Sequence, residues 1–553
     1  MNFRRALAWL LAGSLVPGAA LRAAGDPAIQ TADLKEWLTY LASDELEGRP
    51  TFGAGLGLAA GYLEAHLAAW GVEPAGDHGG YLQTVKVLGV RTTSRASVTV
   101  HVGDKARTFK DGEGVTFPRD MGGKRTLTLD RVEFAGYGFD APSVNHNDFA
   151  GRSVTGAAVV YLGANGPKLG DAQKFRRLLN GRSRHALDQL GAAAAIAPGG
   201  TSERTAVRAA DTSSGPTRQA PDFTTVQRLD RPVSPALTVD DAFYEFLFSA
   251  APVRYTELKR KASAQDPLPS FRLDGVSLTF DIDADYTVVR TQLTHNVVGV
   301  VRGRDPQLRD SFVAFGAHYD HVGYAERDVS ASGGGAPGRV TPTATSDRIW
   351  NGADDDGSGT VSVLGIAKAF ATASVKPRRS LLFVWHAGEE RGLLGSRYFA
   401  DAPTVPIADV VAQLNIDMIG RNRDDDPGQA NTVYLVGSDR ISSELHDINR
   451  AANAALDRPM TLDYEMNDPA DPEQLYYRSD HYSYAAKGIP VIFFTTGLHP
   501  DYHANTDEVS RIEFDKLTRI TELIYRTGLR LADLDHAPVR DNRGPRAGKG
   551  TRE

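Results

Sequence analysis

The sequence contains no cysteine among its 553 residues. Disulfide bonds, thiol nucleophiles, cysteine metal ligands and a lipid anchor on cysteine are therefore excluded. A protein without disulfides is held together by core packing or by bound metal, and 41% hydrophobic residues allow sizeable cores. At this length we expect two or three globular units.

An excess of positive charge is also missing. The chain has 62 lysines and arginines against 69 aspartates and glutamates, a formal net charge of −7. Because nucleic-acid binding needs clustered positive charge, we expect no nucleic-acid partner.

Long apolar runs are absent except at the start of the chain. Met1–Arg5 carries two arginines, an almost wholly apolar stretch follows over Ala6–Leu21, and residues 23–25 are small. This order is typical of a secretory signal peptide, and the stretch is short for a membrane span. We predict a signal peptide over residues 1–24, with an uncleaved anchor as the alternative. A cleaved signal makes the protein periplasmic or secreted, without stable membrane association.

Compact apolar runs recur in the second half of the chain and are separated by several helical stretches. They cover Val297–Val301, Ser311–Ala317, Ser380–His386, Val410–Ile416 and Val491–Thr495. Such runs indicate strands of a mostly parallel sheet that is buried on both faces by helices. The predicted fold class is α/β.

Other parts of the chain differ in residue spacing and composition. Helical spacing of apolar residues predicts helices over Thr31–Ala42 and about 56–70. Thr201–Gln227 is rich in Ser, Thr, Arg and Pro and is expected to be an exposed loop. Residues 536–553 are basic, contain Gly and Pro, and are expected to form a disordered tail.

Histidines and carboxylates gather just past the ends of the apolar runs, where ligands bind in open α/β sheets. His318 follows one run, and Asp320 is placed to accept its second ring N–H. Asp354, Asp355 and Asp356 repel one another unless a cation lies between them. Capping of the predicted helix Val361–Phe370 explains some of these aspartates but not all three.

Three more candidates follow later runs. Glu390 is placed to bind a metal while the adjacent Glu389 stays free as a base. Asp417 is a charge inside an apolar segment, and a buried carboxylate needs a partner or a metal. His503 follows the last strand. Nitrogen and oxygen donors without sulfur suit zinc, with cobalt or manganese as substitutes, and their number suffices for two ions that share one carboxylate.

Five motifs occur in a recognisable order, namely HYDHVG, GADDDGSG, GEERGLLGS, NIDMIG and YHANTDE. Together they resemble the M28 metallopeptidase family of co-catalytic zinc aminopeptidases. The resemblance implies a zinc exopeptidase fold formed by residues 25–124 and 291–535. It also implies two zinc ions per chain and peptide substrates cleaved at their N-terminus.

The resemblance further implies a metal-binding role for each matched residue. His318 and Asp417 would hold one zinc ion, and Glu390 and His503 would hold the other. Asp354 would bridge both ions and would precede a cis peptide bond to Asp355.

Catalytic roles carry over in the same way. Glu389 would be the general base, Asp320 would orient His318, and Tyr502 would stabilise the oxyanion.

The middle of the chain carries a second resemblance. Phe134–Gly138, Asp148–Gly151 and Val154–Tyr161 are similar to a protease-associated (PA) domain inserted in M28 enzymes. We expect this β-rich domain over residues 125–290, bordering the substrate cleft.

Several alternatives remain open at this point. A carboxypeptidase or dipeptidase would use the same metals and would need a basic residue such as Arg421 or Arg478 for the substrate carboxylate. A glutaminyl cyclase, a phosphatase with two metals and a non-catalytic binding protein are further alternatives. No GxSxG or HExxH motif supports another hydrolase class. The glycine-rich stretch Ser330–Arg339 is either a lid or a surface insertion.

Overall fold

The computed structural model describes residues 29–141, 144–169, 175–199, 222–330, 332–469, 471 and 473–542. The predicted signal peptide, most of the predicted loop over 201–227 and the last residues of the predicted tail lie outside this range. No helix among the described residues combines the length and the apolarity that a bilayer crossing requires.

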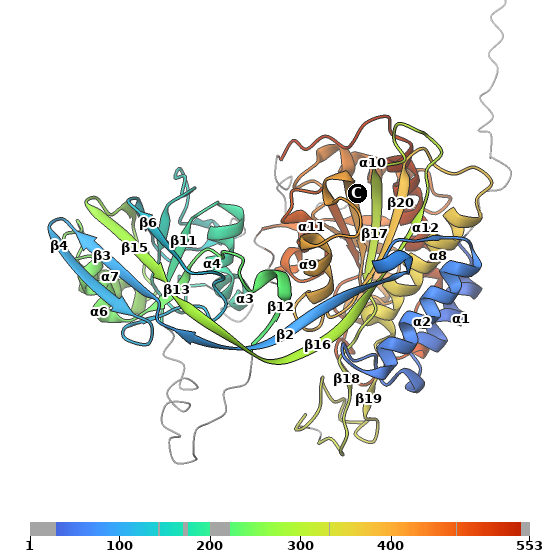
Figure 1. Ribbon diagram of the computed structural model, residues 1–553, viewed down its shortest axis with the longest axis horizontal. Coiled ribbons are helices and arrows are strands. Elements are labelled where there is room, and N and C mark those ends of the chain that lie inside the picture. Colours follow the sequence, from blue (N-terminus) through green and yellow to red (C-terminus); the bar gives the residue numbers. More distant parts are fainter. Residues whose placement is uncertain are drawn as a thin grey trace, which may run out of the picture.

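A ten-stranded mixed sheet forms the larger part of the molecule (Figure 1). Its strand order is β12 (Asp222–Thr225), β2 (Leu82–Ser94), β16 (Ala284–Val301), β20 (Ser380–His386), β17 (Phe312–His318), β21 (Val410–Ile416), β24 (Val491–Thr495), β22 (Thr432–Val436) and β23 (Thr461–Asp463), and β1 (Glu73–Pro74) pairs with β16. The central strands β20, β17, β21 and β24 are parallel, which confirms the α/β class. The pairs that β16 makes with β20 and that β22 makes with β24 are antiparallel, whereas β22 and β23 at the edge of the sheet are again parallel.

Helices cover both faces of this sheet, and the alternation of side chains along each strand explains why. Val313 and Phe315 of β17 join the core beneath α1 (Thr31–Leu41), α2 (Ala54–Ala69), α8 (Gly359–Thr372) and α12 (Phe514–Asp533). Phe312 and Ala314 point to the other face, where α9 (Leu394–Asp401) and α11 (His481–Ala485) pack. A further helix, α10 (Ser443–Ala454), packs against α12. The two helices predicted in the first 70 residues are confirmed.

A second set of strands has its own hydrophobic core and lies beside the large sheet (Figure 1). One sheet has the order β14 (Ser270–Arg272), β7 (Val132–Ala135), β10 (Ala158–Val160), β11 (Ala194–Pro198), β13 (Ala236–Val239) and β5 (Val115–Thr116). The other has the order β4 (Lys105–Lys110), β3 (Ser97–Val102), β15 (Val276–Ile282) and β6 (Arg125–Leu129). Its helices are α3 (Arg176–Asn180), α4 (Arg182–Arg184), α6 (Asp241–Leu247) and α7 (Tyr255–Ser263). We call residues 95–283 without β12 the inserted unit.

Two pairs of short antiparallel strands complete the described strands. They are β8 (Asp140–Ala141) with β9 (His146–Asn147), and β18 (Gly323–Tyr324) with β19 (Ile349–Trp350).

The inserted unit begins earlier than the expected boundary at residue 125. Strand β15 lies between β3 and β6, so strands on both sides of residue 125 belong to one sheet. The reason lies in β2 and β16, which pair from Leu82 to Ser94 and carry the chain out of the large sheet and back as one ribbon. Because both strands continue without a break from the large sheet to the inserted unit, the composition of the sequence does not change where the chain leaves the large sheet.

The start of the expected disordered tail is also different. His536 Nε2 lies 2.9 Å from Glu444 Oε1, and the Val539 amide donates to Glu444 Oε2. The Asn542 amide donates to the Ile441 carbonyl at 3.0 Å. Residues 536–542 are therefore held at the start of α10, because the glutamate near the first turn of α10 accepts from them.

Candidate metal centre and active site

The predicted site residues meet at one edge of the sheet, beyond the carboxyl ends of the central strands. His318 is the last residue of β17, Glu389 and Glu390 follow β20, and Asp417 follows β21. His503 lies in the segment after β24. These ends coincide because the four strands are parallel, and the site lies where α/β sheets bind their ligands.

Asp355 lies between two groups of candidate ligands and directs one carboxylate oxygen at each. Its Oδ1 is 3.2 Å from His318 Nε2, which in turn is 3.7 Å from Asp417 Oδ1. Its Oδ2 is 3.1 Å from His503 Nε2, which is also 3.1 Å from Glu390 Oε2. A carboxylate in this position can bridge two metal ions.

The structure therefore places Asp355, and not the predicted Asp354, between the two groups of candidate ligands. Asp354 turns away from the two groups: its Oδ1 accepts from the Gly420 amide at 2.6 Å, and its Oδ2 is 3.2 Å from His499 Nε2. The cis peptide bond also lies one residue later than predicted, between Asp355 and Asp356.

The side chain of Asp356 accepts hydrogen bonds from the backbone instead of facing the candidate ligands. Its carboxylate accepts from the backbone amides of His318, Met418 and Gly359. The three adjacent aspartates thus diverge, and only the middle one faces both groups of candidate ligands. Repulsion persists all the same: burial raises the pKa of Asp356, and Asp417 and Asp355 add to that rise, which His318 partly offsets.

The second group contains a histidine that the sequence did not assign. His321 is fully buried and its Nδ1 lies 3.0 Å from Glu390 Oε1. With Asp355 and Glu390 it forms a set of ligand atoms that all lie within 4.8 Å of one another. The HYDHVG motif contained this residue, but only the fold shows that its ring faces the same carboxylates as His503.

The histidines and carboxylates of the site strongly affect one another's pKa values. Burial disfavours the charged form of His503, but the carboxylates of Asp355 and Glu390 outweigh burial and raise its pKa to about 11. Burial and Asp355 raise the pKa of Glu390, yet His321 and His503 more than compensate and hold it at about 2. Closely packed buried carboxylates of this kind need nearby positive charge.

The residues present fit a pair of metal ions. Glu390 Oε1, Asp355 Oδ2 and both ring nitrogens of His321 are buried, and apart from the ion pairs given above none of them makes a hydrogen bond in the described part of the chain. Each group offers imidazole nitrogen and carboxylate oxygen without sulfur, which is the donor set that suits zinc.

Asp320 contacts His318 in a way that differs in detail from the prediction. His318 Nδ1 is 3.0 Å from the backbone oxygen of Asp320 and 3.8 Å from its Oδ1. The carboxylate accepts from Thr51 Oγ1 at 2.7 Å and from the Glu389 amide at 3.1 Å. Asp320 thus links His318 to Glu389, the candidate base.

A buried arginine near the N-terminus, unnoticed in the sequence, fixes the metal-site segments. Arg49 Nε donates to the carbonyl of Tyr319 at 2.9 Å, and its Nη1 and Nη2 donate to the carbonyls of Asn351 and Gly352. No local motif marks Arg49, because all three partners are about 300 residues away in the chain.

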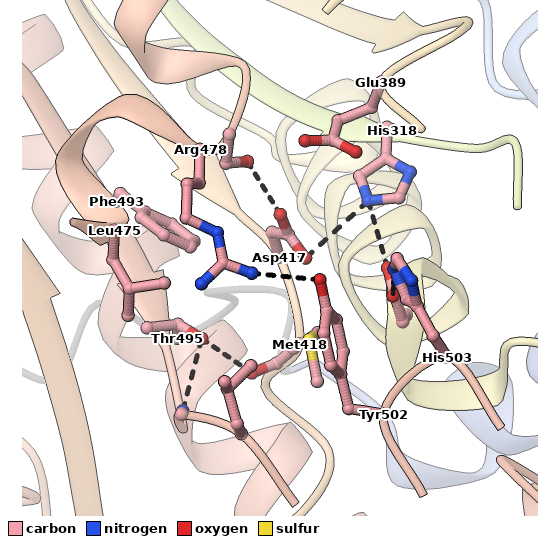
Figure 2. A pocket seen from close by; sticks show the side chains of 14 residues that line it. His318, Glu389, Asp417, Met418, Leu475, Arg478, Phe493, Thr495, Tyr502 and His503 are labelled. Carbon is pink, nitrogen blue, oxygen red and sulfur yellow. Dashed lines mark hydrogen bonds and ion pairs between the residues drawn. The ribbon is translucent and has the colours of Figure 1, made fainter. Parts of the chain in front are cut away.

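A cavity opens beside the metal centre and is lined by Glu389, Asp417, Arg478 and Tyr502 together with apolar side chains (Figure 2). Burial raises the pKa of Glu389, and repulsion from Glu390 and Asp417 adds to that effect. Tyr502 Oη accepts a hydrogen bond from Arg478 Nη2 at 3.1 Å. Arg421, the other arginine considered, pairs with Asp425 and Asp501 and is not among the lining residues.

Comparison with known proteins identifies the region that carries this site. Residues 296–528 match the model of Peptidase family M28. This part of the chain is an M28 peptidase region. It contains every residue that lines the cavity, and it confirms the resemblance predicted from the five motifs.

The M28 region has curated relatives among fungal enzymes. Leucine aminopeptidase 1 of Trichophyton equinum is 26% identical over 238 residues, 42% of this chain and 56% of that protein. The probable leucine aminopeptidase 2 of Aspergillus oryzae is 30% identical over 206 residues, 37% of this chain and 34% of that protein. The match thus spans little more than half the length of the first relative and about a third of the second.

Solved structures align over most of the chain. The aminopeptidase from Aneurinibacillus sp. strain AM-1 has 17% identity and a TM-score of 0.43, and the alignment covers 94% of this chain and 98% of that one. A zinc aminopeptidase from Bacillus subtilis has 15% identity and a TM-score of 0.42, with 93% and 99% covered.

Proposed function

We propose that this chain is a dinuclear zinc exopeptidase that removes N-terminal residues from peptides, with Glu389 as the general base. The observation that carries the proposal is Asp355, whose two oxygens face separate groups of histidine and carboxylate side chains. His318 and Asp417 would hold one ion, and Glu390 and His503 would hold the other. The M28 match and the fungal leucine aminopeptidases support the same conclusion.

The chain's own residues supply the remaining chemistry. Bound zinc would lower the pKa of a water molecule and polarise the scissile carbonyl. Glu389 takes a proton from the attacking water molecule and gives it to the leaving amine, a task that suits a carboxylate whose pKa burial has raised. The Tyr502 hydroxyl donates to the oxygen on which negative charge develops. The site's carboxylates attract the free α-amine of the substrate and so orient its N-terminus.

Hydrolysis of aminoacyl-4-nitroanilides tests this proposal, with N-acetylated analogues as controls. We expect cleavage of the free-amine substrates alone. Glu389→Gln is expected to lower kcat by about 100- to 10,000-fold, because the base is lost, while the bound zinc measured by elemental analysis stays unchanged. Cleavage of the acetylated analogues would contradict the requirement for a free amine. Zinc-loaded protein that hydrolyses no peptide substrate would instead favour a binding protein.

A carboxypeptidase or dipeptidase is the second candidate, and one observation favours it. Arg478 lines the cavity next to Asp417 and Tyr502, where it could meet a substrate carboxylate. Release of C-terminal residues from N-acetylated peptides would move the assignment to this candidate.

We also propose that the protein is exported and that the inserted unit is a PA-like domain. The charged and apolar start of the chain supports a signal peptide over residues 1–24. The motifs at 134–161 support a PA-like inserted unit. N-terminal sequencing of the mature protein should begin between residues 20 and 25, and a retained Met1 in exported protein would contradict cleavage.

A further inference from the structure

Arg478 brings a positive charge into a cavity whose other charged groups are mostly carboxylates. Figure 2 shows its guanidinium pointing into the cavity toward Tyr502, with Leu475 and Phe493 on the same side. The next residue, Ser479, donates its hydroxyl to Asp417 Oδ2 at 2.7 Å. Arg478 is therefore placed by the same backbone segment that holds a proposed metal ligand.

The charges around Arg478 do not cancel. Its Nη1 lies 2.9 Å from Glu473 Oε2, but the same oxygen lies 3.0 Å from Arg177 Nε. One glutamate thus serves two guanidinium groups, and these three side chains together carry one net positive charge. The Glu389 carboxylate lines the same cavity and also attracts Arg478. The Glu473 side chain is 41% exposed, whereas that of Arg478 is 21% exposed. Solvent therefore screens the charge of Arg478 less than the charge of Glu473.

The inserted unit holds this segment in place. Arg177 belongs to α3, and the guanidinium of Arg184 in α4 lies 5.7 Å from the ring centre of Tyr477. The Tyr482 hydroxyl donates to Asp188, also in the inserted unit. Contacts on both sides of Arg478 limit how far its backbone can move.

We propose that Arg478 binds a carboxylate of the substrate, and this rests on the proposed exopeptidase function. A guanidinium carries five N–H donors in a planar fork that matches a carboxylate, and its contacts with Glu473 and Tyr502 do not use them all. The carboxylates at the metal centre attract the substrate ammonium, and Arg478 attracts a negative group across the same cavity. The site therefore selects a substrate with charges of both signs.

Two parts of a peptide can supply this carboxylate. One is the side chain of an N-terminal aspartate or glutamate, whose methylene groups would lie along Leu475 and Phe493. The other is the C-terminal carboxylate of a dipeptide. The chemistry at Arg478 is the same for both, and matched substrate pairs separate them.

The experiment compares kcat/KM for two pairs of substrates. The first pair is glutamyl- and glutaminyl-4-nitroanilide, and the second is leucyl-alanine and its C-terminal amide. We expect wild-type protein to prefer the charged member of at least one pair, and Arg478→Met to reduce that preference about 10- to 100-fold. Arg478→Lys should restore part of it, since lysine keeps the charge but not the fork.

The controls separate recognition from folding and from the proposed function itself. Arg302→Gln removes an exposed arginine that pairs with Glu73, and it should leave both preferences unchanged. Thermal unfolding checks that each variant is folded. Loss of preference in the first pair assigns the carboxylate to a side chain, and loss in the second assigns it to the C-terminus.

Wild-type preferences that persist in folded Arg478→Met would overturn the proposal, and so would a wild-type enzyme with no preference in either pair. Leucyl-4-nitroanilide has no carboxylate, so its hydrolysis by the wild-type protein reports on the exopeptidase function without the proposed contact to Arg478. If every substrate is inert, calorimetric binding of glutamate against glutamine, and of leucyl-alanine against its amide, to the zinc-loaded protein replaces the rates. Equal affinities within both pairs would also overturn the proposal.

Discussion

At the scale of single residues, the three adjacent aspartates make different contacts. Asp355 faces both groups of candidate ligands, whereas Asp354 and Asp356 accept hydrogen bonds from the backbone around them. Asp507 accepts from the amides of Asp354 and Asp355 and so fixes the direction of the middle side chain. Identical side chains in sequence are therefore unequal in function.

Exchange of single carboxylates tests this division. We expect Asp355→Asn to lose zinc, because an amide removes the charge that both ions would share. Asp354→Asn should keep its zinc but lose roughly 1–3 kcal/mol of stability, since its carboxylate accepts from Gly420 and faces His499. Elemental analysis after gel filtration and urea unfolding give the two readouts. Zinc loss confined to Asp354→Asn would restore Asp354 as the bridging residue.

At the scale of elements, close contact between α12 and β17 sets the position of a strand that ends in His318, a proposed metal ligand. A Cβ placed on Gly528 in α12 would lie 2.2 Å from Cζ of Phe315. Phe315 is fully buried and stacks on Phe383 at 5.4 Å between ring centres. The glycine allows the helix to approach the strand, and His318 lies three residues further along that strand.

Two glycine substitutions test this contact against helix propensity. Gly528→Ala should destabilise the protein by about 1–3 kcal/mol, because the added methyl group displaces a packed ring. Gly61→Ala in α2 meets no atom within 4 Å and should stabilise the protein by up to about 1 kcal/mol. Urea unfolding measures both. A gain in stability for Gly528→Ala would show that propensity outweighs the contact.

At the scale of the whole molecule, one pair of antiparallel strands connects the large sheet to the inserted unit. Strands β2 and β16 run from the large sheet into the inserted unit (Figure 1), and Arg95 forms two hydrogen bonds of 3.0 Å with Asp283 where they meet that unit. The inserted unit then contacts the segment that carries Arg478. Its position beside the cavity follows from the ribbon and these contacts together.

The global stability should fall as the solution becomes acidic, and His481 is one cause. Burial lowers the pKa of His481 to about 3, well below the 6.5 of an exposed histidine. Below pH 6.5 the unfolded chain binds a proton that the folded protein does not take up until about pH 3. Stability contributed by the neutral ring is therefore present above pH 6.5 and is lost as the pH falls, by up to about 1.4 kcal/mol per pH unit.

The variant His481→Phe should lose this part of the pH dependence. Its ring can keep the stacking on Phe493, where the centres are 4.7 Å apart. The free energy of unfolding of metal-free protein is measured between pH 7 and pH 4. His78→Phe, at an exposed position, serves as the control and should keep the wild-type slope. Equal slopes for all three proteins would contradict the prediction.

The sequence by itself determined the α/β class, the edge of the sheet that carries the site, and the residues His318, Glu390, Asp417 and His503 that meet there. It could do so because parallel strands align their carboxyl ends, so polar residues that follow separate apolar runs are brought together. Only the tertiary structure decided which aspartate stands between the two groups, since that depends on Gly420, His499 and Asp507, which lie far away in the chain. The same holds for Arg49 and for Arg478, because their surroundings are built from segments that no local pattern connects.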